Sequence, residues 1–390
     1  MSFSLLALVV LVGLLGPVLA GRSSWHLPVV VGELLGGILI GASGLRLIDA
    51  GEPTFTALAN IGFALTMFVV GSHIPVRDQA VRSALGRGAI GAVVAALVAV
   101  AAGLALAGLF GTGHPVLYAV LIASSSAALV LPIAAAIGLT GPSSLQLVAQ
   151  VSIADTLCIV ALPLAIDPVN AAPAALGALA VMAIAVLAFF GLLALDRLGL
   201  RQRGHKVSER RKFALELRIS LLLLFALAGL AQLTHVSIML AGFALGLVVA
   251  AIGEPRRLAR QLFAVTDGFF GPLFFVWLGA SIQLSHLGAH PFMILLGGCL
   301  GAAAIVAHVA VRLVGQPLLL GVMAAGQLGV PVAAATLGTQ LHLLRPGEDA
   351  ALLLGALVTV AATTIAGSLR ARRTAGGPTA LAPPGGVPAG

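Results

Sequence analysis

Apolar runs of about 20 residues recur along almost the whole chain and are separated by short polar stretches. A helix that crosses a bilayer needs about 20 predominantly apolar residues, and roughly thirteen runs reach that length. They cover approximately residues 2–20, 28–48, 55–73, 88–110, 115–138, 144–166, 172–195, 213–234, 236–253, 263–284, 291–314, 316–342 and 350–369. The pattern predicts an all-α polytopic membrane protein with about 13 transmembrane helices.

Composition supports this interpretation and defines the expected domains. Of 390 residues, 60% are hydrophobic and 9% are charged, against roughly 25% charged in an ordinary soluble domain. We expect one transmembrane domain over residues 1–370 and a disordered cytoplasmic tail over 371–390, because that stretch is rich in Pro and Gly. The first run is also compatible with a cleaved signal peptide, although no Lys or Arg precedes its apolar residues.

Basic residues favour one side of the predicted membrane. With thirteen spans, one side collects Arg22, three residues within 77–87, seven within 197–212, three within 256–260 and three within 370–373, whereas the other side has Arg46 and Arg345. Positive loops are cytoplasmic, so we expect an integral plasma (inner) membrane protein with the N-terminus outside and the C-terminus cytoplasmic. The net charge of +8 then reflects topology and attraction to anionic membrane lipids, and no nucleic acid partner is expected.

Helix-breaking and polar residues gather in two spans that occupy corresponding places in the chain. The fifth span carries Ser124, Ser125, Ser126 and Pro132, and the twelfth carries Gly326, Gln327, Gly329 and Pro331. Matched interruptions in two halves of a chain are typical of broken helices around a midplane binding site, and a displacement of seven spans reverses the crossing direction. The pattern predicts inverted repeats with two crossed discontinuous helices, in core helices at about 88–166 and 291–369. Close helix packing by small residues is the alternative.

One carboxylate, Asp155, lies deep in the apolar run QVSIADTLCIVALPLAI (150–166), with no cation within ten residues on either side. An ionisable residue at such depth is functional by default. A single carboxylate in a partly dry site holds either a proton or a monovalent cation, so competition for its charge couples the two fluxes. Further oxygen ligands are expected from backbone carbonyls freed at the interruptions and from the hydroxyls of Ser124, Ser125, Ser126, Ser152 and Thr156.

Three segments resemble monovalent cation/proton antiporters of the second large family. PVVVGELLGGILIGASGLRLI (28–48) resembles their glycine-rich second helix, NIGFALTMFVVGSHIPV their next helix, and GPLFFVWLGASIQL (271–284) their proline and double-phenylalanine signature. The resemblance implies exchange of Na⁺ or K⁺ for protons without a cofactor, by a homodimer in which a core with crossed broken helices moves against a dimerisation domain. It places the ion-binding aspartate at Asp155.

The chain departs from the family pattern at two positions. Many members carry an acid or an amide where this chain has Ala154, and a glutamate where it has Gln327. With one carboxylate at the cross, we expect electroneutral exchange of one proton per cation. The resemblance also makes Arg312 the expected charge-balancing residue at the cross. Glu33 and Gln327 are expected in a funnel or in a supporting role.

Other functions fit the sequence less well. An intramembrane aspartyl protease needs two aspartates that share a proton, and one aspartate is deep here, so an enzyme is not expected. A sodium-coupled symporter of an organic anion on the same scaffold remains the alternative, although acids are scarce. A non-transporting sensor would need a partner domain.

Overall fold

The computed structural model describes residues 1–21, 29–74, 77–167, 171–198, 213–234, 236–253, 256–282 and 291–375. These ranges contain helices and no β-strand. Ten helices are long and apolar enough to cross a membrane, and three shorter apolar helices bring the described total to thirteen. The predicted all-α class and span number are therefore confirmed.

One group of helices, called here the support group, comes from the first and middle parts of the chain. It comprises α1 (Phe3–Gly13), α2 (Leu15–Ala20), α3 (Val29–Ile40), α4 (Pro53–Ser72), α9 (Ala171–Arg197), α11 (Leu215–Leu233), α12 (Ile238–Ile252), α13 (Arg256–Val265), the π-helical turn η1 (Thr266–Phe270) and α14 (Gly271–Ser281). Within it, α4 packs on α12, and α14 packs on α3 and α4.

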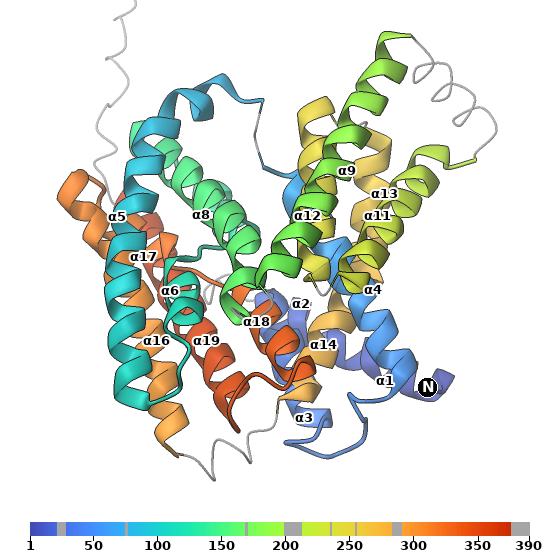
Figure 1. Ribbon diagram of the computed structural model, residues 1–390, viewed down its shortest axis with the longest axis horizontal. Helices are drawn as coiled ribbons and strands as arrows, with labels where there is room; N and C mark the ends of the chain where they lie inside the picture. Colours follow the sequence, from blue (N-terminus) through green and yellow to red (C-terminus); the bar gives the residue numbers. More distant parts are fainter. Residues whose placement is uncertain are drawn as a thin grey trace, which may run out of the picture.

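The second group, called here the crossed-helix group, contains both interrupted spans. It comprises α5 (Gln79–Phe110), α6 (Pro115–Ala123), α7 (Ala127–Ala136), α8 (Pro142–Ile166), α16 (Pro291–Val309), the 3₁₀ turn η2 (Ala310–Val314), α17 (Leu318–Ala324), α18 (Gly329–Gln340) and α19 (Glu348–Ala375). Figure 1 shows α5 and α16 on one side of the molecule and α11 and α13 on the other. The two groups meet where α8 contacts α9 and α12.

The crossed-helix group consists of two similar units. In the first, α5 packs on α6 and α8, and the pair α6–α7 is one span broken at its middle. In the second, α16 packs on α17 and α19, and the pair α17–α18 is the broken span. This is the predicted order of inverted repeats, with the discontinuous helix second in each unit.

Several boundaries differ from the expected spans. α3 ends at Ile40 instead of continuing to residue 48, and the Ala42 N–H then donates to the Ala280 carbonyl of α14. The glycines Gly37 and Gly279 let the two helices approach closely. A Cβ added at Gly279 would lie only 3.0 Å from Gly37 Cα. At the other end of the chain, α19 runs to Ala375, five residues into the expected tail, and residues 376–390 lie outside the described ranges.

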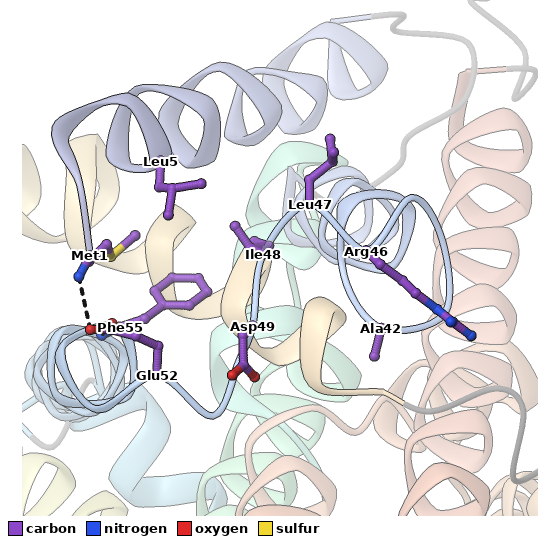
Figure 2. A pocket seen from close by; sticks show the side chains of 9 residues that line it. All are labelled: Met1, Leu5, Ala42, Arg46, Leu47, Ile48, Asp49, Glu52 and Phe55. Carbon is purple, nitrogen blue, oxygen red and sulfur yellow. Dashed lines mark hydrogen bonds and ion pairs between the residues drawn. The ribbon is translucent and has the colours of Figure 1, made fainter.

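α4 begins beside a surface hollow of about 660 Å³ (Figure 2). The Glu52 carboxylate accepts a 2.9 Å hydrogen bond from the Met1 ammonium and a 2.7 Å bond from the Phe55 N–H, and so caps the helix. The ammonium and this backbone donor lower the pKa of Glu52 to about 2. The start of α4 is therefore fixed by a charge-assisted cap.

Candidate functional site

The two interrupted helices meet at their breaks. Ser124 and Ser126, between α6 and α7, have extended backbone conformations. The Ser126 N–H donates a 2.7 Å hydrogen bond to the Gly326 carbonyl, between α17 and α18. Four half-helix ends therefore lie together inside the crossed-helix group.

Asp155 of α8 lies at one of these ends. Its side chain is 3% exposed, and Oδ2 accepts a 2.8 Å hydrogen bond from the N–H of Ala127, the first residue of α7. The first N–H groups of a helix lack intrahelical acceptors and carry partial positive charge. The end of α7 therefore favours an anion at the Asp155 carboxyl.

Gln327 lies at an end of opposite polarity. Its Nε2 donates to the carbonyls of Leu121 (2.7 Å) and Ile122 (3.4 Å) in the last turn of α6, and its N–H donates to Thr359 Oγ1 of α19 (3.1 Å). The last carbonyls of a helix lack intrahelical donors. An amide satisfies them, whereas an ionised carboxylate has no proton to donate. Gln327 therefore links α6 to α19 at the cross, and its supporting role in transport stays a prediction.

The three serines have different contacts. Ser124 Oγ donates to Leu121 O of its own helix at 2.8 Å. Ser125 Oγ donates across the cross to Ala324 O at 2.5 Å. Ser126 lines a large cavity beside Ala127, which makes it the serine of the three that adjoins both the Asp155 hydrogen bond and open space.

The two hydroxyls expected from α8 also differ. Ser152 is one turn before Asp155, is 9% exposed, and its Oγ has no hydrogen-bond partner among the described residues. Thr156 Oγ1 donates to Ser152 O at 2.7 Å within the helix. Because a buried hydroxyl without a partner costs free energy, Ser152 is the better placed of the two to contact an ion or water at Asp155.

Arg312 does not lie at the cross, so its expected charge-balancing place is wrong. It is exposed in η2, where the helix that carries it tightens before α17. The basic side chain at the cross is His308, which is fully buried in the last turn of α16 and whose Nε2 lies 3.1 Å from Ser125 Oγ. The sequence signal was available, because residue 308 is four before 312 and so one turn deeper on the same helix face.

His308 belongs to a chain of buried hydrogen bonds that joins α16 to both interrupted helices. Its Nδ1 lies 2.9 Å from Ala304 O, and Ser125 links its Nε2 to Ala324 O. The two carbonyls only accept, so the direction of the contacts in this chain depends on the tautomer of His308.

A cavity of about 1100 Å³ connects the cross to the support group. It is lined by Ser126 and Ala127 at the break of the first interrupted helix, and by Glu33, His73 and Asp267 from the support group. Glu33 thus lines a cavity that also reaches the cross, and its role in a funnel stays a prediction. Asp267 and His73 were not singled out from the sequence as funnel residues.

A comparison with known protein families shows which family the chain belongs to. The family described as "sodium/hydrogen exchanger, transmembrane" matches residues 6–370. The chain belongs to the sodium/hydrogen exchanger family. Membership covers both helix groups, confirms the resemblance to monovalent cation/proton antiporters, and makes the chain an integral membrane protein of a transporter family.

Two relatives carry antiporter names. YjbQ of Bacillus subtilis (strain 168), whose name assigns it Na⁺/H⁺ antiport provisionally, is 24% identical over 392 residues, which cover 93% of this chain and 62% of YjbQ. The chain thus spans less than two thirds of that relative's length. The high-affinity Na⁺/H⁺ antiporter NhaS3 of Synechocystis sp. (strain ATCC 27184 / PCC 6803 / Kazusa) is 24% identical over 384 residues, covering 86% of this chain and 82% of NhaS3. Neither name supports the symporter alternative.

Solved structures show the same fold. The sodium proton antiporter MjNhaP1 from Methanocaldococcus jannaschii, determined at pH 8, matches with a TM-score of 0.67 and 17% identity over 95% of this chain and 97% of that chain. A second structure of MjNhaP1, an electron microscopy map, matches with a TM-score of 0.61. At this identity the likeness concerns the fold.

Proposed function

We propose that this exchanger transports a monovalent cation against protons by alternating access, with Asp155 as the shared binding group. The observation that carries the proposal is the hydrogen bond from Ala127 N–H to Asp155 Oδ2 at the crossing of the two interrupted helices. A carboxylate buried at a half-helix N-terminus is neutralised either by a proton or by a cation. Because one site holds one of them at a time, movement of one drives movement of the other.

The proposed cation site is built around Asp155. Ser126 lies beside its backbone donor, and Ser152 Oγ lies one turn away without a partner in the described part of the chain. Carboxylate, hydroxyl and carbonyl oxygens are suitable ligands for a hard cation. The names of YjbQ and NhaS3 support Na⁺ as the cation, and K⁺ is the alternative that competition in the same assay decides.

The proposed stoichiometry is one proton per cation. Asp155 is the carboxylate at the cross, and the residue before it, Ala154, is apolar and buried. A site with one carboxylate exchanges one charge for one charge, so the cycle is electroneutral.

We further propose a homodimer in the plasma (inner) membrane, with membrane lipids around it. The dimer and the motion of the crossed-helix group against the support group rest on the family resemblance. The orientation, with a cytoplasmic C-terminus, rests on the positive loops; most of the 196–212 loop lies outside the described residues. Labelling of Arg203→Cys by a membrane-impermeant thiol reagent, in a background without Cys158 and Cys299, tests it, and labelling from outside contradicts it.

Proteoliposomes test the transport function. In the wild type, an inward Na⁺ gradient should drive proton efflux, and in Asp155→Asn, which keeps the size of the side chain, this flux should stop. Asp349→Asn, in the first turn of α19 and away from the cavity, is the matched control and should transport normally. Wild-type flux in Asp155→Asn contradicts the proposal.

A further inference from the structure

Glu348 is a buried carboxylate that the proposed ion site at Asp155 does not involve. It is the first residue of α19, and its side chain is 0% exposed. Two groups of α6 meet its Oε1 atom: the Tyr118 hydroxyl donates at 2.6 Å, and His114 Nδ1 lies at 2.8 Å. The backbone N–H of Arg345 donates to Oε2 at 2.9 Å. An ionised carboxylate accepts at both oxygens, so it holds all three partners at once.

The two carboxylate oxygens of Glu348 serve different parts of the molecule. The Arg345 N–H donates to Oε2, and the Glu348 N–H donates to the Arg345 carbonyl at 3.0 Å, a reciprocal arrangement that resembles a capping box. Capping of α19 accounts for Oε2 alone. Oε1 contacts α6, which belongs to the other unit of the crossed-helix group, and so joins the two units where α6 and α19 begin.

The last turn of α6 is tied to the same face of α19. Gln327 Nε2 donates to the Leu121 carbonyl at 2.7 Å, and the Gln327 N–H donates to Thr359 Oγ1 at 3.1 Å. Glu348 and Thr359 are about three helical turns apart, so they lie on one face of α19. Tyr118 thus fixes the first turn of α6 to this face, and Gln327 fixes the last turn.

The position of α6 determines where the break after it lies. The carbonyl of Leu121, one turn after Tyr118, also accepts hydrogen bonds from the N–H and the Oγ of Ser124, where α6 ends. Ala127, whose N–H donates to Asp155, follows directly after the break. A displacement of the first turn of this nine-residue helix therefore also displaces the donor at the ion site.

We infer that Glu348 is a positioning residue for the exchange, because it holds the first turn of α6 and thereby places the Ala127 N–H at Asp155. The inference rests on the proposed function and adds a residue that shapes its site. Glu348 does not line the cavity, so it acts on ion affinity without contacting the ion.

Tyr118→Phe tests this role with the least disturbance, because it removes the hydroxyl and keeps the buried ring. In proteoliposomes its KM for Na⁺ should rise about three- to tenfold, as expected for coupled members of one hydrogen-bond network, while the maximal rate stays nearly unchanged. Glu348→Gln should raise the KM more, because an amide accepts at one atom only. Asp349→Asn removes the neighbouring charge from the same turn of α19 and is the matched control with an unchanged KM.

A double variant tests the route through Ala127. Ala127→Pro removes the N–H that the Asp155 carboxylate accepts, so the position of α6 no longer affects the ion through it. In this background Tyr118→Phe should raise the KM no further. A rise as large as that in Tyr118→Phe alone overturns the inference. Thermal unfolding in detergent shows whether each variant is folded.

A purely structural role of the cluster gives a different result. If Tyr118→Phe and Glu348→Gln unfold at lower temperature and transport more slowly at an unchanged KM, Glu348 only stabilises the fold, and the inference is overturned while exchange at Asp155 stands. Exchange that survives in Asp155→Asn overturns the proposed function instead.

Discussion

The Asp155 carboxylate accepts a hydrogen bond of 2.8 Å from the backbone N–H of Ala127, and this joins the uninterrupted helix α8 to the first residue of the half-helix α7. The donor is a main-chain group, so no basic side chain has to enter the site. The carboxylate is stabilised while charged, yet a cation or a proton still neutralises it. The break in the first interrupted helix thus creates the donor that the exchange site needs.

Ala127→Pro should impair cation binding selectively. Proline at the first position of a helix is tolerated, and Ser126 before it already has the extended backbone that proline requires. The substitution removes the N–H that bonds a charged group, worth about 1.5–3 kcal/mol, so the apparent Na⁺ affinity should fall by about ten- to a hundredfold. Sodium-dependent proton flux in proteoliposomes measures this.

Ala127→Gly is the matched control, because glycine keeps the N–H. It should bind Na⁺ much as the wild type does. Equal affinities of the proline and glycine variants would mean that the main-chain donor is unimportant.

His308 and Arg312 should differ sharply in their effect on stability. His308→Ala removes a fully buried side chain together with its contacts to Ser125 Oγ and Ala304 O, and should lower the free energy of unfolding by about 1–3 kcal/mol. Arg312→Ala removes an exposed side chain and should stay within about 0.5 kcal/mol. Thermal unfolding of the two purified variants compares them. A larger loss of stability in Arg312→Ala than in His308→Ala would contradict the exposed position of Arg312.

The cap of α4 by Glu52 should stabilise the protein only in the pH range where the Glu52 carboxyl is ionised. The pKa of this carboxyl is lowered from 4.5 to about 2, so its contribution is complete above about pH 4.5 and is lost as the pH falls toward 2. The difference in unfolding temperature between wild type and Glu52→Gln should therefore be largest at pH 6 and smaller at pH 3. A difference that is equal at both values argues against the charge-assisted cap.

The membrane potential should not drive transport. One elementary charge moved through the membrane is worth about 2.3 kcal/mol per 100 mV, so any net charge per cycle shifts the gradient at which flux reverses. With Asp155 as the exchanging carboxylate, the Na⁺ gradient at reversal should be the same at 0 and −100 mV, set with valinomycin and potassium. A reversal gradient that moves with voltage shows that net charge crosses the membrane in each cycle and contradicts one-for-one exchange.

Periodicity and span length were enough to predict the architecture. Apolar runs of membrane length predicted the thirteen helices, and the matched Ser and Gly–Pro interruptions predicted which two spans are broken. These features are local in sequence. The prediction of Asp155 as the ion site also needed no coordinates, because a carboxylate with no nearby cation is conspicuous in an apolar run.

Contacts between segments that are distant in the chain could not be predicted from the sequence. Arg312 and His308 share a helix face, and which of them meets Ser125 depends on how deep α16 sits against α6 and on the tightening of α16 into η2. Asp267 becomes a neighbour of Glu33 only through the packing of α14 on α3. The three serines look alike in sequence, and their different acceptors are set by the crossing itself.

Proton release on cation binding tests the shared-site account most directly. When Na⁺ is added to weakly buffered, purified protein at a pH where Asp155 is protonated, each cation bound there should displace one proton, and the medium should acidify until the site is saturated. Asp155→Asn should release almost none. If Na⁺ binds the wild type tightly without proton release, or if Asp155→Asn releases as many protons as the wild type, then cation and proton do not compete at this carboxylate.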